Sequence, residues 1–247
     1  MEISRYELKY HIPPDRLSDI RRYLLRYCEA DVNSRGDWYP IYSLYLDNDS
    51  YRMYRDTEDS APFRMKLRVR GYANPAAPVK LEVKHRSREL VRKTSAVVSA
   101  SDWARIRRST DIFQIHKAGE FLQFTESLRA TPKMLVSYER LAFSSKVDDY
   151  VRVTFDRRMR CQPMPEWSLA GQDTRWRNVD DPASLGGGRS VYLMELKFVV
   201  APPAWLHDMV NHFQLQRRGY SKYGRAVRRW VFERESAWDL CTSRRIA

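Results

Sequence analysis

At 247 residues the chain is long enough to bury a substantial core, and we expect residues 1–247 to form a single domain. A composition with 43% hydrophobic and 13% aromatic residues excludes a disordered basic tail. The 44 Lys and Arg residues outnumber the 31 Asp and Glu residues, and this net charge of +13 favours a polyanionic partner: nucleic acid, a phosphate polymer or an acidic membrane surface.

Cysteine usage and hydropathy favour a cytoplasmic protein. The three cysteines are odd in number and lack the close spacing of a zinc ribbon or a redox site, which indicates a reducing compartment: Cys28, Cys161 and Cys241. Charged residues among the first ten interrupt any signal-peptide core, and no run of about 18 apolar residues is present to span a bilayer. We expect any membrane association to depend on a partner protein.

The first predicted strand covers residues 5–9, where charged and apolar side chains alternate and would therefore lie on opposite faces. A turn at residues 13–15 leads into residues 16–27, whose apolar spacing predicts a helix lying against the sheet or barrel. Residues 40–47 alternate as a strand does, and residues 48–50 begin a short helix or turn.

Two strongly basic strands are predicted next, over residues 64–70 and 80–86, with a turn rich in Pro and Ala at residues 73–78 between them. Both alternate Lys or Arg with apolar residues. Residues 90–99 predict a further strand, and the Ser-Asp-Trp sequence at its end caps a helix over residues 101–108.

The second half of the chain predicts a helix, three strands and two more helices, over residues 113–128, 133–143, 151–157, 191–199, 202–216 and 225–234. Residues 219–223 separate the last two helices. Residues 163–188, with glycines at 186, 187 and 188, form the expected flexible loop. About eight strands with helices inserted between some of them indicate an α+β fold with a largely antiparallel closed β-barrel, which would turn the charged faces inward.

Each charged strand, taken singly, is also explained by an antiparallel strand with one solvated face. The same habit recurs in the later strands, at Tyr138, Arg140, Arg152, Glu195 and Lys197, and this repetition indicates one shared polar surface. Cations crowded at low dielectric repel one another, so such a surface requires bound anions, water or interleaved carboxylates.

Three glutamates stand among these cations: Glu7, Glu82 and Glu195. Each is explained either as a structural ion-pair partner or as a ligand for a divalent metal that bridges phosphate oxygens. Arg grips phosphate oxygens with a planar fork and Lys adds a mobile charge, so Lys66 and Lys197 also become candidate phosphate ligands. Ser221 and Lys222 favour anions if they begin a helix, although an ordinary turn between helices explains them as well.

Several activities lack their sequence motifs here. The chain has no P-loop, no Gly-rich dinucleotide turn, no nucleophile elbow and no zinc-type cluster of His and Cys. Its aromatic residues do not interleave with the basic ones in the pattern of an RNA-recognition motif, which disfavours nucleic acid as the partner.

The motifs, taken together and in order, resemble a known family: Arg5-x-Glu7-x-Lys9-Tyr10, Lys66-x-Arg68-x-Arg70, Glu82-x-Lys84-His85-Arg86, Tyr138-x-Arg140, Val151-Arg152-Val153, Glu195-x-Lys197 and Ser221-Lys222-Tyr223. They resemble the polyphosphate polymerase domain of the vacuolar transporter chaperone (VTC) complex, in its stand-alone bacterial form, over residues 3–232. That family belongs to the triphosphate tunnel metalloenzymes, also called the CYTH superfamily.

The resemblance implies an eight-stranded antiparallel tunnel that binds a triphosphate or polyphosphate chain, with helices outside and a C-terminal helical element near one mouth. It implies catalysis through positioning and charge neutralisation by Lys9, Arg68, Arg70, Lys84, Arg140 and Arg152, and further phosphate contacts from Lys93, Tyr138, Ser221 and Lys222. It assigns Mn²⁺ or Mg²⁺ to Glu195. The implied reaction transfers the γ-phosphate of ATP to a polyphosphate chain and releases ADP, beside a membrane-embedded partner that accepts the product.

The sequence departs from this family at two positions. Arg5 stands where the hydrolytic members carry the first glutamate of Glu-x-Glu-x-Lys, which favours phosphate transfer over hydrolysis by a metal-activated water. Gly219 stands where polymerases tend to carry another basic residue. The alternatives to a polymerase are a tripolyphosphate or nucleoside triphosphate hydrolase, a non-catalytic polyphosphate-binding module, and a nucleic-acid binder.

Overall fold

A computed structural model of the chain describes residues 3–32, 34, 37–74, 76–88, 90–108, 118–148, 150–181, 190–199 and 201–233. Eight strands pair antiparallel in a closed ring, in the order β7 (Thr131–Ser145), β3 (Tyr39–Asp47), β4 (Phe63–Tyr72), β5 (Val79–Ser87), β6 (Leu90–Val98), β1 (Ile3–Ile12), β10 (Tyr192–Phe198) and β8 (Arg152–Pro163). The pairing of β8 with β7 closes the barrel. The α+β fold with an eight-stranded antiparallel barrel, predicted from the alternating strands, is confirmed.

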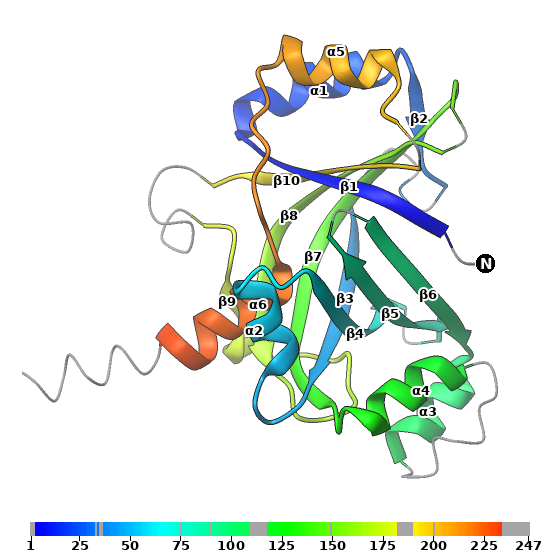
Figure 1. Cartoon of the computed structure of the whole chain (residues 1–247), viewed down its shortest axis with the longest axis vertical. Coiled ribbons are helices and arrows are strands. Elements are labelled where there is room, and N and C mark those ends of the chain that lie inside the picture. Colours follow the sequence, from blue (N-terminus) through cyan, green and yellow to red (C-terminus); the bar gives the residue numbers. More distant parts are fainter. Residues whose placement is uncertain are drawn as a thin grey trace, which may run out of the picture.

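Helices cover the outer faces of the barrel (Figure 1). Those helices are α1 (Leu17–Leu24), α2 (Arg52–Glu58), α3 (Ala100–Arg108), α4 (Gly119–Ser127) and α5 (Ala204–His212). One buried cluster joins α1 and α5 to the apolar sides of β1, β8 and β10, and a second joins α3 and α4 to those of β4 and β5. The apolar sides of β1, β4, β5 and β10 are therefore buried outside the barrel, which leaves their charged sides for its interior.

Helix α6 (Lys222–Val227) lies on the interior side of the barrel, where it packs on β7 and β8. Tyr223, Ala226 and Val227 are buried in a third cluster with Ile41 of β3 and Val136 of β7. A π-helical turn, Arg228–Phe232, continues the chain. The helix thereby fills one side of the barrel interior, and its first residues border the interior space that remains.

Several element boundaries differ from the prediction. Strand β8 runs on to Pro163, and β9 (Arg177–Asn178) pairs with it inside the expected loop. Strand β2 (Cys28–Ala30) pairs with β7 and was not predicted, because three residues are too few to display alternation. Two turns of 3₁₀-helix, Pro14–Arg16 and Asp173–Arg175, complete the described elements.

The last two helices also differ from their predicted limits. Helix α5 ends four residues early, because Gln214 adopts a left-handed conformation with φ 49° and its N–H donates to the Asn211 carbonyl. Helix α6 begins at Lys222 instead of residue 225, because the Ser221 hydroxyl accepts the N–H of Gly224 and caps its first turn.

Some predictions concern positions outside the described residues: the start of the helix over 113–128, the glycines at 186–188, Cys241 and residue 234. Cys28 and Cys161 are buried free thiols. Within the described ranges, no helix has the length and apolar character needed to cross a membrane.

Candidate active site

The barrel encloses a cavity of about 200 Å³, which we call the lumen. All of the predicted site residues except Glu82 and Tyr138 line it: Glu7, Lys9, Lys66, Arg68, Arg70, Lys84, Lys93, Arg140, Arg152, Glu195, Lys197, Ser221 and Lys222. Strands β1, β4, β5, β6, β7, β8 and β10 all contribute, together with the start of α6. The closed ring therefore brings together residues more than 200 positions apart in the sequence.

One side of the lumen, formed by β4, β5 and β6, carries cations directly opposite one another. Strand register pairs Lys66 with Lys84 and Arg70 with Lys80, and Lys84 in turn with Lys93. We call this side the basic wall. Like charges that face each other directly across strands destabilise a sheet, so this wall gains stability when an anion occupies the lumen.

Glu82 is the one carboxylate of the basic wall among the described residues, and it lies beneath the lumen surface. Its side chain is 1% exposed and forms ion pairs with Arg68 at 2.5 Å, with Arg70 at 3.3 Å and with Lys93. Burial opposes its ionisation, but Arg68 and Lys93 more than offset this and lower the pKa of Glu82 to about 2. Because Glu82 does not line the lumen, a metal ion held there by phosphates would not reach its oxygens, so the geometry favours the ion-pair alternative for Glu82.

The opposite side of the lumen, formed by β1, β10, β8 and β7, alternates the two signs of charge, and we call it the mixed wall. Strand register places Lys9 opposite Glu195, and Lys197 opposite both Glu7 and Arg152. Glu195 forms ion pairs with Lys197 at 2.9 Å, Lys222 at 3.3 Å, Arg140 at 3.7 Å and Lys9 at 3.8 Å. This wall is the place where the lumen concentrates carboxylate oxygens.

Two lysines of the mixed wall have strongly altered ionisation. Burial lowers the pKa of Lys197 to about 7, against the opposing effect of Glu195. Burial likewise lowers the pKa of Lys9 to about 8, with Glu195 again opposing. Burial also opposes the ionisation of Glu195, but Lys197 and Lys222 outweigh it and hold the pKa of Glu195 well below its ordinary value.

A buried triad fixes the positions of Arg140 and Lys222 through Asp156, which was not among the predicted site residues. Arg140 donates to both carboxylate oxygens of Asp156, at 2.7 and 2.8 Å, and the ammonium of Lys222 lies 2.6 Å from Asp156. Asp156 is four residues after Arg152 on the same strand, so the alternation places both on one face, and this is the sequence signal that could have identified it. The Tyr138 ring lies 5.3 Å from the Arg140 guanidinium and 4.8 Å from the Lys222 ammonium, so it supports these cations from below instead of lining the lumen.

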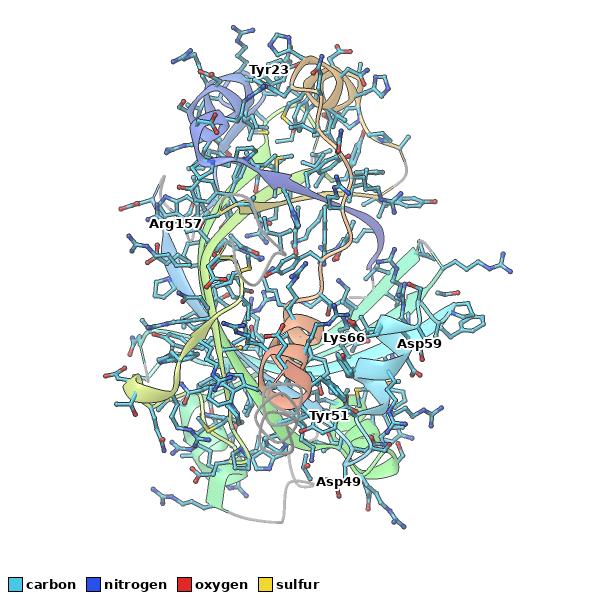
Figure 2. All side chains as sticks on the ribbon, turned by 90° about the vertical axis from the view of Figure 1, so that its left-hand side faces the viewer. Tyr23, Asp49, Tyr51, Asp59, Lys66 and Arg157 are labelled. Atoms are coloured by element: carbon cyan, nitrogen blue, oxygen red, sulfur yellow. The ribbon has the colours of Figure 1, made fainter. Side chains whose placement is uncertain are left out.

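Lys66 and Ser221 meet where the lumen opens. The Lys66 ammonium donates to the Ser221 hydroxyl at 2.9 Å, and Figure 2 shows Lys66 beside the start of α6. Burial holds the pKa of Lys66 well below its ordinary value, and the neighbouring Lys9 and Lys84 lower it further. An anion at this position would relieve the repulsion among the three lysines.

The remaining lumen residues were not in the predicted site: Arg5, Tyr39, Tyr45, Tyr72, Lys80 and Tyr223. Arg5 lies 3.6 Å from Glu7, and Tyr45 lies 3.4 Å from Arg68. The alternation of residues 40–47 places Tyr45 on one face of its strand, but which face meets the lumen depends on long-range pairing. Asp31, which pairs with Arg152 at 2.9 Å, also had no sequence signal.

The lumen carboxylates fit a metal ion that is held jointly by the protein and by the phosphates of a bound substrate. Within the described part of the chain no group of three or more His, Cys, Asp or Glu side chains is assembled for a metal. Glu7 and Glu195 are the acidic residues of the described lumen lining. Burial opposes the ionisation of Glu7, but Lys84 and Lys197 outweigh it and hold the pKa of Glu7 well below its ordinary value, so this carboxylate is charged as well. Mg²⁺ is commonly held by one or two carboxylates together with substrate phosphates, which matches this donor set.

Three solved structures resemble this chain at low sequence identity. An adenylyl cyclase-like protein from Hippeastrum, reported to have a dominant triphosphatase activity, is 13% identical over 91% of this chain and 95% of its own, with a TM-score of 0.49. The PH1819 protein of Pyrococcus horikoshii is 10% identical over 94% and 98%, with a TM-score of 0.43. The Mimivirus capping enzyme triphosphatase is 9% identical over 86% and 89%, with a TM-score of 0.37.

No curated protein matches the chain in sequence. The family model described as the VTC domain matches residues 4–231, which is nearly the whole span over which the motifs resemble that family. The chain belongs to the VTC domain family.

Proposed function

We propose that this protein is a metal-dependent polyphosphate polymerase that transfers the γ-phosphate of ATP to a polyphosphate chain inside the lumen. The observation that carries the proposal is the basic wall, in which Lys66, Lys84 and Lys93 form one row across three strands of a closed barrel. Such a row is unfavourable by itself and becomes favourable around a linear polyanion.

The chemistry needs no nucleophile from the protein. A terminal phosphate oxygen of the chain attacks the γ-phosphorus, the bond between that phosphorus and the bridging oxygen to the β-phosphate breaks, and ADP leaves. Arg68, Arg70 and Lys84 of the basic wall, with Lys9, Arg140 and Arg152 of the mixed wall, would hold the two phosphate groups in line and neutralise their charge. Lys66, Lys93, Tyr138, Lys197, Ser221 and Lys222 would support these phosphate contacts.

Mn²⁺ or Mg²⁺ is the proposed cofactor. Glu195 would hold the ion, with Glu7 as the second carboxylate, and the bound ion would supply charge neutralisation on the phosphate oxygens. Lys197 and Lys222, which form ion pairs with Glu195, would then also contact the incoming phosphates.

The main alternative is a hydrolase that acts on tripolyphosphate or nucleoside triphosphates. Arg5 lies beside Glu7 and lines the lumen where a third carboxylate would favour a metal-activated water. A guanidinium there attracts phosphate instead, which supports transfer between phosphate groups over transfer to water.

Incubation of the protein with ATP and Mn²⁺, followed by gel detection of polyphosphate, tests the proposal. Polymer together with ADP is the expected result. Release of orthophosphate without polymer would establish the hydrolase, and tight polyphosphate binding without either product would leave a binding module. We further propose a cytoplasmic chain that works beside a membrane-embedded partner, which co-purification from detergent extracts would test.

A further inference from the structure

A second cavity of about 320 Å³ adjoins the lumen and opens between α2, α6 and the paired ends of β4 and β5. We call it the α6 mouth. Five residues line both cavities, so the two cavities adjoin: Glu7, Lys9, Lys66, Lys84 and Ser221. A linear ligand that fills the lumen and passes between these five side chains would therefore enter the α6 mouth.

The α6 mouth adds four arginines that had no part in the predicted site: Arg64, Arg86, Arg225 and Arg228. Together with Lys9, Lys66 and Lys84 they make seven cationic side chains around this opening, against two carboxylates, among the residues that the structure describes. Both carboxylates already form ion pairs, Glu7 with Lys84 and Glu58 with Arg228. A large excess of positive charge therefore faces the opening.

The arginines of β4 and β5 continue the basic wall outward. Strand register places Arg64 directly opposite Arg86, one step beyond the Lys66 and Lys84 pair. Residues that share a strand face are about 7 Å apart, so the row from Arg64 to Arg70 extends over about 20 Å. That row is longer than the three phosphate groups of one nucleoside triphosphate.

The helical side of the α6 mouth is anchored by contacts between elements. Arg228 is held by Glu58 of α2, and the Arg225 guanidinium lies 5.0 Å from the Tyr220 ring. Arg64 and Arg86 form a like-charged pair across the strands, and a bridging anion stabilises such a pair. Arginine forks suit phosphate groups, which offer several oxygens at each step of a chain.

We propose that the α6 mouth binds the phosphate groups of a polyphosphate chain that lie beyond the lumen, so that the chain leaves the barrel between α2 and α6. The ligand class rests on the proposed function. The site itself does not depend on polymer synthesis, because it can be measured by binding alone.

The test compares two probes, tripolyphosphate and a size-fractionated long-chain polyphosphate, by isothermal titration calorimetry. In the double variant Arg64→Gln with Arg86→Gln, affinity for the long chain should fall about tenfold or more, because charge-assisted hydrogen bonds are lost. Affinity for tripolyphosphate should not change. Arg225→Gln, on a different element, should show the same selective loss, and it keeps the test usable if the double variant folds poorly.

Arg22→Gln is the matched control, because its side chain lies on α1 and is 77% exposed. It should bind both probes as the unmodified protein does. Equal losses for both probes in the mouth variants would place the arginines in the triphosphate site and overturn the proposal, and unchanged binding of both would overturn it as well. Selective loss in a protein that makes no polymer from ATP would uphold the α6 mouth and reject the polymerase.

Discussion

Lys66 of β4 lies directly opposite Lys84 of β5, and both side chains line the lumen. Two ammonium groups held in this way repel each other, and Lys93 extends the row onto β6. The sheet tolerates the arrangement because Glu7 pairs with Lys84 and Glu82 pairs with Lys93. The row is therefore neutralised only in part, and this imbalance is the basis of the binding predictions below.

Tripolyphosphate should stabilise the fold. A ligand that binds only the native state at 100 times its dissociation constant adds about 2.7 kcal/mol, which corresponds to a rise of roughly 5–10 °C in Tm for a domain of this size. Differential scanning fluorimetry over a concentration series would measure it. An equal rise with sodium sulfate at the same ionic strength would show that general screening, and not the lumen, is responsible.

Asp156→Asn should destabilise the protein strongly. Asp156 is fully buried and neutralises both Arg140 and Lys222. Breaking a buried ion pair by removing one partner costs about 3–5 kcal/mol, because the other charges remain buried without compensation. Urea denaturation would measure the loss.

The control for that variant is Asp19→Asn, which removes an exposed ion pair with Arg22 in α1. It should leave the denaturation midpoint unchanged, since exposed pairs contribute little. Similar midpoints for both variants would mean that the Asp156 triad is solvated.

Phosphate affinity should weaken as pH rises. Burial lowers the pKa of Lys197 to about 7 and that of Lys9 to about 8, so both are cationic at pH 6 and largely neutral at pH 9. Calorimetric titration with tripolyphosphate, without metal, should show affinity falling over this range. Lys197→Met should flatten the part of the profile near pH 7.

The contribution of Lys197 to stability should rise with pH, whereas phosphate affinity should fall. In the unfolded chain Lys197 returns to its ordinary pKa of 10.5, so between pH 7 and 10.5 the unfolded state binds more protons than the folded state. The contribution of Lys197 to the free energy of unfolding therefore rises with pH in that window. Urea denaturation at a series of pH values would measure the free energy of unfolding of Lys197→Met minus that of the unmodified protein. This difference should fall as pH rises from 7 to 10.5, and a constant difference would contradict the lowered pKa.

Glu195→Gln should separate metal binding from phosphate binding. The substitution removes the carboxylate that pairs with Lys197 and Lys222. Without metal, tripolyphosphate should bind more tightly, because one negative charge has left the lumen. With Mn²⁺, polymer synthesis should drop by at least about tenfold, as expected for the loss of a charge-stabilising interaction. Full metal-dependent activity in this variant would remove Glu195 from the proposed metal site.

Arg5→Glu should shift the reaction toward hydrolysis. The new carboxylate would stand beside Glu7, where Arg5 now lies 3.6 Å from it. Orthophosphate release from tripolyphosphate should rise and polymer yield should fall, because a further carboxylate favours a metal-bound water and weakens the hold on phosphate. Arg5→Gln is the matched control, since it removes the positive charge without adding a carboxylate. If both variants release the same amount of orthophosphate, Arg5 does not decide between the two reactions.

Much of the lumen could be predicted from the sequence because alternation is local. Successive strand side chains point to opposite faces, so Arg68 and Arg70 had to share a face, as did Glu195 and Lys197. The start of α6 was harder to predict, because it depends on the Ser221 hydroxyl, which accepts the N–H of Gly224 and caps the helix. Strands of two or three residues, such as β2 and β9, are too short to leave a periodic signal.

The sequence by itself determined which side chains share a face of each strand, and it determined the excess of positive charge that they carry. Only the tertiary structure decided which cations stand opposite one another and which carboxylates line the lumen. Glu82 is buried under three cations and Glu195 lines the lumen, although both follow the same alternating pattern. The reason is strand register. The pairing of distant strands, with β7 joined to β8, determines which side chains lie beside each carboxylate, and no local preference of the chain encodes that pairing.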